Sequence, residues 1–178
     1  NDRGETMRRI ITATVQNSSG VLNRVTGLLS RRGFNIESIT VGETELEGIS
    51  KITFVVDVEE SQKIEQLTKQ LHKQIDVLKV NDITDTNKVA RELCLIKVVA
   101  TPQSRSEING IVEPFRARIL DISKDSLIVE VTGKPDKIEA IIDLLTPYGI
   151  KELSRTGITA FTRGKQNKQV SDYQTLIV

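Results

Sequence analysis

Cysteine, histidine and aromatic residues are scarce in this sequence, and each shortage excludes a class of site. One cysteine, Cys94, and one histidine, His72, occur in 178 residues. A disulfide and a zinc site built of Cys and His both need more of these residues than one chain supplies. The missing disulfide suits a reducing compartment, so we expect a cytoplasmic protein. Cys94 lies in the apolar run ELCLIKVVA and is predicted to be buried and inert, whereas His72 is predicted to be exposed.

Aromatic residues make up 3% of the chain, tryptophan is absent, and the formal net charge is +1. Nucleic-acid-binding proteins usually have a basic face and stacking aromatics, so we expect no nucleic-acid partner. No apolar run approaches the ~20 residues of a membrane span, and the start of the chain lacks the apolar core of a signal peptide. With 38% hydrophobic and 28% charged residues, the sequence is typical of a soluble globular protein without a membrane partner.

The first half of the chain has the pattern of a β-α-β-β-α-β unit. Alternating apolar residues predict strands over 8–15, 35–42, 50–58 and 76–83. Helical spacing predicts one helix from Val21 to a stop at Gly33 and a second helix beginning at Ser61. The residues predicted to form the core are Ile11, Ala13, Val15, Val21, Leu22, Val25, Leu28, Leu29, Ile52, Phe54, Val56, Val58, Ile64, Leu67 and Leu71.

The second half repeats this order. Strands are predicted over 91–100, 117–122 and 126–132, and residues 149–161 close the unit. Ile108, Ile111, Val112 and Phe115 mark one helix, and Pro135 opens another. The sequence therefore predicts an α+β protein of two ferredoxin-like domains, residues 7–84 and 85–164, joined through a polar linker at 84–91 and flanked by extensions at 1–6 and 165–178.

In each domain, two helices are expected to pack on one face of a four-stranded antiparallel sheet. The second face of the first sheet would carry Ile10, Thr12 and Thr14, a mixed surface that is solvated, ligand-bound or covered by a partner. The unpaired edge strand is the better docking element, because its free backbone groups can pair with another chain. We therefore expect a homodimer through the first domain.

A polar turn, Asn17-Ser18-Ser19-Gly20, stands between the first strand and the first helix. The amide groups at a helix N-terminus favour an anion, and Gly20 lets a ligand approach the backbone. The alternative is plain helix capping, for which Asn and Ser are common residues. The matching turn of the second half, 101–104, is Thr-Pro-Gln-Ser, and this difference favours a small ligand bound by the first unit alone.

From Met7 to about Gly164 the chain closely resembles one family, the regulatory small subunits of acetohydroxyacid synthase, also called acetolactate synthase. The first unit resembles an ACT domain, and the second resembles the C-terminal ferredoxin-like domain of that family. The resemblance is specific because several separate motifs match in order. They are MRRIITATVQNSSGVLNRVTGLLSRRGFNIESITVG, QLHKQIDVLKV, VARELCLIKV, FRARILDI and SRTGITAFTRG.

The resemblance implies a regulatory subunit without an active site or cofactor of its own. Its partner would be a catalytic large subunit that uses thiamine diphosphate, Mg²⁺ and FAD in branched-chain amino-acid biosynthesis. The small subunit would raise the activity of that enzyme and confer feedback inhibition by valine or a related amino acid. The effector would bind between two ACT domains, at turn positions that match here as Asn17, Gly20, Val21 and Leu22 of one chain and at Asn35 and Ile36 of the other. Its carboxylate would meet the N–H groups from Ser19 to Leu22.

Three other functions remain as alternatives. A free-standing ACT-domain sensor would bind an amino acid but no catalytic subunit. An acyl-phosphate hydrolase would use Arg8, Arg9 or Arg24, but no general base is evident nearby. An RNA-binding module would need stacking aromatics on its central strands, and Phe54 lies on the predicted core face instead.

Overall fold

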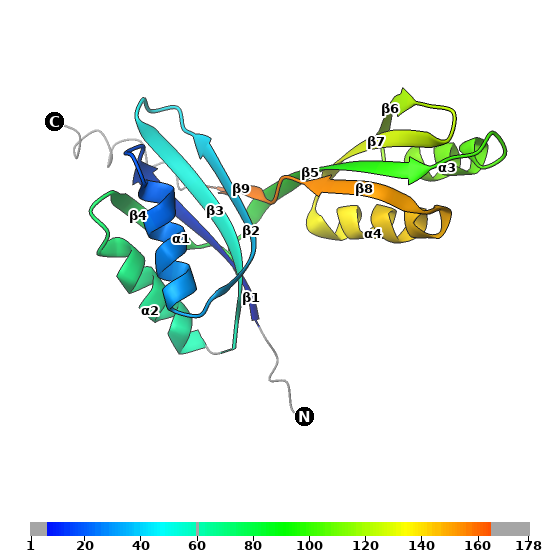
Figure 1. The fold of residues 1–178 in the computed structure, drawn as a ribbon. Helices are drawn as coiled ribbons and strands as arrows, with labels where there is room; N and C mark the ends of the chain where they lie inside the picture. Colours follow the sequence, from blue (N-terminus) through cyan, green and yellow to red (C-terminus); the bar gives the residue numbers. More distant parts are fainter. Residues whose placement is uncertain (1–6, 60, 165–178) are drawn as a thin grey trace. The chain divides into compact units, whose positions relative to one another are not determined.

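The computed structural model describes residues 7–59 and 61–164, which fall into two compact units (Figure 1). The first unit comprises residues up to Val89 together with those from Ala160, and the second comprises Ala90–Thr159. The extensions predicted at 1–6 and 165–178 lie outside the described residues. None of the helices within the described ranges is long and apolar enough to cross a membrane.

The first unit has the predicted β-α-β-β-α-β order. Its antiparallel sheet has the strand order β2-β3-β1-β4, and α1 and α2 cover one face of it (Figure 1). The ferredoxin-like fold predicted for this half is confirmed. The elements are β1 (Met7–Gln16), α1 (Val21–Arg31), β2 (Asn35–Glu43), β3 (Ile49–Val58), α2 (Ser61–His72) and β4 (Val77–Asp82).

The core of the first unit lies between the helices and the sheet, as the alternation predicted. Ile11, Ala13 and Val15 of β1 are fully buried, as are Ile52 and Phe54 of β3. A shift of one residue in strand register would turn this whole set to the opposite face, so burial specifies the pairing. Phe54 is a core residue, which removes it as a base-stacking group.

The second face of the first sheet is partly covered by residues of the same unit. Thr12 is 4% exposed, and Lys51 donates a hydrogen bond from Nζ to the Ala160 carbonyl oxygen at 3.1 Å. The same Nζ lies 4.4 Å from the centroid of the Phe161 ring. Burial lowers the pKa of Lys51. Partial covering by the chain's own residues is not among the three alternatives that the sequence predicted for this face.

The second unit repeats the same order, with the strand order β6-β7-β5-β8 and with β9 paired to β5. Pro135 is the first residue of α4, where its missing N–H leaves no helical bond unmade. The elements are β5 (Lys88–Val99), α3 (Arg105–Val112), β6 (Arg118–Ile122), β7 (Ser126–Gly133), α4 (Pro135–Leu145), the 3₁₀ helix η1 (Thr146–Tyr148) and β8 (Ile150–Arg155). Most residues of β9 (Thr159–Thr162) belong to the first unit.

Three details of the predicted elements are wrong. The linker does not extend over 84–91, because β5 already begins at Lys88 and its backbone is paired by β9. Phe115 lies beyond α3, since Pro114 has no N–H to continue the helix, although its ring still packs on the core. Residues 149–161 form two strands, β8 and β9, separated at Gly157, whose φ is +85°.

Cys94 is fully buried on β5, as predicted, and its burial should make the thiol unreactive. Burial raises the pKa of the thiol to about 11. Only the thiolate reacts, and at pH 8 a thiol with this pKa is ionised to about one part in a thousand. We expect a disulfide reagent to modify Cys94 at pH 8 at least 100-fold more slowly in the native chain than in the chain unfolded by guanidinium. Equal rates in the two states would contradict the buried thiol.

Candidate functional site

The polar turn is held by backbone hydrogen bonds that leave its outer surface free. The Asn17 amide donates to the Gly48 carbonyl oxygen at 2.7 Å, and the Ser18 amide donates to the Gln16 carbonyl oxygen at 2.8 Å. Gly20 precedes α1 with φ +80°, in the left-handed region where glycine is favoured because it has no Cβ.

The amide groups at the start of α1 are not capped by side chains. The N-cap residue of α1 is Gly20, and the exposed Asn17 side chain makes no hydrogen bond within the described ranges. The helix-capping interpretation of Asn17 is therefore wrong. Four backbone amides at the end of the turn and the start of α1 donate to no acceptor within residues 7–59 and 61–164. They are the amides of Ser19, Gly20, Leu22 and Asn23.

The matching turn of the second unit is closed by its own side chains. The Thr101 amide donates to Ser104 Oγ at 2.9 Å, and the Ser104 amide donates to Thr101 Oγ1 at 3.2 Å. The Ser104 amide therefore has an acceptor within its own turn, whereas the Gly20 amide, which is the last of the first turn, has none within the described residues. The hydrogen bonding of the two turns differs at this position.

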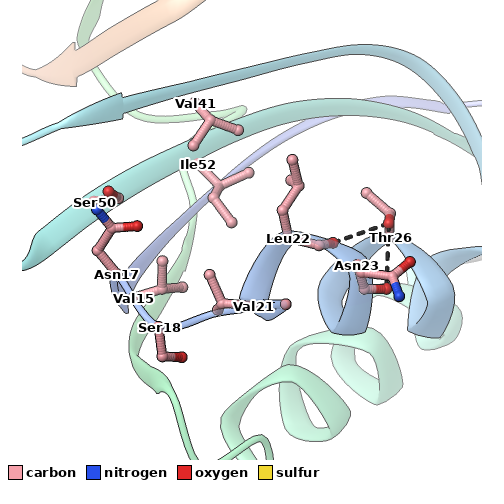
Figure 2. A pocket seen from close by; sticks show the side chains of 11 residues that line it. Val15, Asn17, Ser18, Val21, Leu22, Asn23, Thr26, Val41, Ser50 and Ile52 are labelled. Carbon is pink, nitrogen blue, oxygen red and sulfur yellow. Dashed lines mark hydrogen bonds between the residues drawn. The ribbon is translucent and has the colours of Figure 1, made fainter.

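A pocket of roughly 550 Å³ lies beside the open turn, within the size range of small-molecule sites (Figure 2). Four of the predicted effector-binding residues line it: Asn17, Gly20, Val21 and Leu22. Most of the surface of the pocket is apolar, and two apolar side chains at its rim are exposed, Leu22 at 42% and Val41 at 45%, so the core position predicted for Leu22 is wrong. The site therefore combines free N–H donors with an apolar surface.

Seven further residues that line the pocket are not among the predicted site residues. Ser50 is the most informative of them, because it occupies a core-facing position of β3 in phase with Ile52 and Phe54. A small polar residue at such a position leaves space under the start of α1. That break in an otherwise apolar alternation is the signal that could have revealed the pocket. The seven residues are Val15, Ser18, Asn23, Thr26, Val41, Ser50 and Ile52.

Three predicted site residues do not line this pocket. Ser19 is exposed next to it, with its carbonyl oxygen bound by Arg24 Nη1 at 3.1 Å. Asn35 begins β2 and donates from Nδ2 to Asp57 Oδ2 at 3.2 Å, and Ile36 packs against the core. Val41, at the other end of β2, is the residue of that strand that reaches the pocket. One chain therefore does not bring Asn35 and Ile36 to Asn17.

Comparison with known proteins accounts for both units. Residues 11–79 match the family described as the AHAS small subunit-like ACT domain, and residues 91–164 match the family described as the small subunit of acetolactate synthase. The acetolactate synthase small subunit of Bacillus subtilis is 64% identical over 172 residues, which cover 97% of this chain and 100% of the relative. The chain belongs to the acetolactate synthase small subunit family. Its first unit carries the regulatory ACT domain of that family.

Two further relatives extend this agreement to a distant organism and to a solved structure. A probable acetolactate synthase small subunit of Archaeoglobus fulgidus is 52% identical and covers 90% of this chain and 99% of its own. The crystal structure of the acetolactate synthase small subunit from Thermotoga maritima superposes with a TM-score of 0.81 at 40% identity. That match covers 89% of this chain and 99% of the solved chain, so the family likeness includes both units.

Proposed function

We propose that this small subunit binds valine, or a related branched-chain amino acid, and transmits its concentration to an acetolactate synthase catalytic subunit. The observation that carries the proposal is the aliphatic pocket beside the four free amides at the start of α1. A carboxylate is favoured at such amides by hydrogen bonding and by the helix dipole. An α-amino acid with an aliphatic side chain suits both parts of the site, because its carboxylate suits the amides and its side chain suits the apolar pocket.

The placement of the ligand follows from the chemistry of the lining residues. The carboxylate would accept hydrogen bonds from the amides of Gly20 and its neighbours, and Asn17 and Ser50 would bind the polar end. Ser50 supports this role because it is 5% exposed and makes no side-chain hydrogen bond in the ranges that the structure describes. The side chain of the ligand would contact Val21 and Ile52. A methylene group changes binding by about 1–3 kcal/mol, so valine over leucine is expected to be a preference.

A second copy of the chain would complete the site. Strand β2 is an edge of its sheet, with free backbone groups along one side. Antiparallel pairing of two β2 strands about a two-fold axis brings the beginning of one beside the end of the other. Asn35 and Ile36 of the second copy would then lie near Val41, at the rim of the pocket. This pairing would also cover the exposed side chains of Leu22 and Val41.

The partner is a catalytic large subunit, expected to hold thiamine diphosphate, Mg²⁺ and FAD and to supply all of the chemistry. Valine can inhibit that enzyme only if it binds the low-activity arrangement of the complex more tightly than the active one. The two binding equilibria are linked. If valine changes the affinity between the subunits by some factor, the catalytic subunit must change the affinity for valine by the same factor.

The test is calorimetric titration with L-valine, L-leucine and L-isoleucine, on the chain alone and on its complex with the catalytic subunit. We expect saturable binding of one valine per chain or per dimer, together with activation of the catalytic subunit. Binding without any association with the catalytic subunit would favour a free-standing sensor. Absence of binding in both preparations would contradict the effector site.

Asn35→Ala tests the contribution of the second copy. We expect the dissociation constant for valine to rise about 10-fold while the chain remains dimeric in sedimentation experiments, because Asn35 lies on the edge strand and away from the core. Asp57→Asn is the matched control, since it alters the group that Asn35 contacts within its own chain. An equal loss in both variants would assign Asn35 a role only within its own chain.

A further inference from the structure

One side chain outside the pocket fastens the polar turn from behind. The Arg24 guanidinium, on the second turn of α1, donates from Nη1 to the Ser19 carbonyl oxygen and from Nη2 to Ser18 Oγ, both at 3.1 Å. Nη2 also forms an ion pair with Asp76. Arg24 itself does not line the pocket, but Ser18, whose hydroxyl group it contacts, does.

Asp76 anchors the other side of this arrangement. It precedes β4, its side chain is only 12% exposed, and its carbonyl oxygen accepts the Gln16 amide at 2.8 Å. Hydrogen bonds from the Ser18 hydroxyl and the Arg24 guanidinium hold the pKa of Asp76 below its ordinary value. The carboxylate is therefore ionised at neutral pH. Through Arg24 and Asp76, the turn is tied both to α1 and to the strand that borders β1.

We propose that Arg24 and Asp76 are positioning residues of the effector site, which hold the amides of the turn in the arrangement that receives the ligand. This inference rests on the proposed function and extends it to two residues that do not contact the ligand. A turn that is already ordered does not have to be fixed by the effector, so affinity rises without a new contact. We call the contacts of Arg24 with Ser18, Ser19 and Asp76 the clamp. Disrupting the clamp should lower the affinity for valine while leaving the pocket walls in place.

The geometry at Gly20 points to the same pair. A Cβ built on Gly20 would lie 3.1 Å from Arg24 Nη1, which is closer than nine in ten Cβ contacts. A side chain at position 20 would therefore push the guanidinium by a few tenths of an ångström from the place where it contacts Ser19. The absence of a side chain at Gly20 serves the clamp as well as the approach of the ligand.

The experiment measures valine binding and thermal unfolding of Arg24→Gln, Asp76→Asn and the double variant, each as the full chain with its catalytic subunit. We expect each single variant to raise the dissociation constant for valine at least 10-fold. The double variant should lose no more than the worse single one, because both changes remove the same interaction. Activation of the catalytic subunit without valine should persist in all three.

Arg9→Gln is the matched control. Arg9 is also on the first unit, and it pairs with Asp82 at 2.6 Å and Asp85 at 2.9 Å at the end of β1 remote from the pocket. With Arg9 24% exposed and Asp82 18% exposed, this network is as sheltered as the clamp. Arg9→Gln should lower the unfolding temperature but change the dissociation constant for valine by less than twofold.

The outcomes separate this inference from the proposed function. Absence of valine binding by the unsubstituted complex would overturn the effector site and the clamp together. If the unsubstituted complex binds valine and Arg24→Gln has a dissociation constant for valine within twofold of its value, the clamp alone is overturned. An equal loss of affinity in Arg9→Gln would also overturn it, because general destabilisation would then account for the effect. If Arg24→Gln fails to fold, Asp76→Asn provides the same comparison.

Discussion

Replacing Gly20 with aspartate is expected to abolish the response to valine while the small subunit continues to activate its catalytic partner. Gly20 has φ +80°, and a Cβ there would meet Arg24 Nη1 at 3.1 Å. The new carboxylate would lie beside Arg24 and the free amides of the turn, where the carboxylate of the effector is expected. We expect the dissociation constant for valine to rise at least 100-fold in calorimetric titration. The inhibition curve of the holoenzyme should become flat.

Gly33→Asp separates this effect from backbone strain. Gly33 ends the same helix with φ +73°, and a Cβ there would meet nothing within 4 Å. Both substitutions place an aspartate in the left-handed region, where Asp is better tolerated than most residues, and the strain is about 1–2 kcal/mol in either case. Gly33→Asp should leave the affinity for valine within twofold. A full valine response in Gly20→Asp would remove the turn from the effector site.

Replacing Arg155 with leucine is expected to destabilise the second unit more than most single substitutions. Arg155 pairs with Glu92 on β5 and with Glu139 on α4. The Glu92 side chain is only 4% exposed, and these two carboxylates raise the pKa of Arg155 against the opposing effect of its burial. Removing one partner leaves a buried charge without compensation, which costs about 3–5 kcal/mol. Urea unfolding followed by circular dichroism should show this loss.

The double variant Arg155→Leu/Glu92→Leu is expected to recover most of that stability. It removes both charges, and a buried ion pair replaced by apolar residues is often close to neutral. Lys97→Leu is the surface control on the same pair of strands. Lys97 contacts Glu152 at 3.3 Å, and that carboxylate is 75% exposed, so its loss should change stability by less than about 1 kcal/mol. If Arg155→Leu lowers the free energy of unfolding no more than Lys97→Leu does, the buried ion pair contributes no more to stability than the surface pair.

The element order of both units could be predicted from the sequence because burial on one face leaves a periodic record. Ile11, Ala13 and Val15 alternate along β1, and Val21, Val25 and Leu28 recur along α1, so each element shows its core face locally. Phe115 was misplaced although the adjacent Pro114 prevents the helix from continuing. The linker was misplaced because a distant strand decided the backbone there. Lys88 is in a strand because β9 pairs with β5. No residue within 84–91 indicates that β9 is a pairing partner.

By itself, the sequence determined the two repeated units, the core-facing residues and the turn at Asn17–Gly20, because periodicity and turn chemistry act over a few neighbouring residues. Only the tertiary structure decided what surrounds the turn. Strand register places Ser50 and Val41 at the pocket, and chain folding brings Asp76 to Arg24 across 52 residues. Contacts of this kind depend on how distant segments pack. For the same reason, Asn35 follows the turn closely in sequence yet lies at the far end of β2.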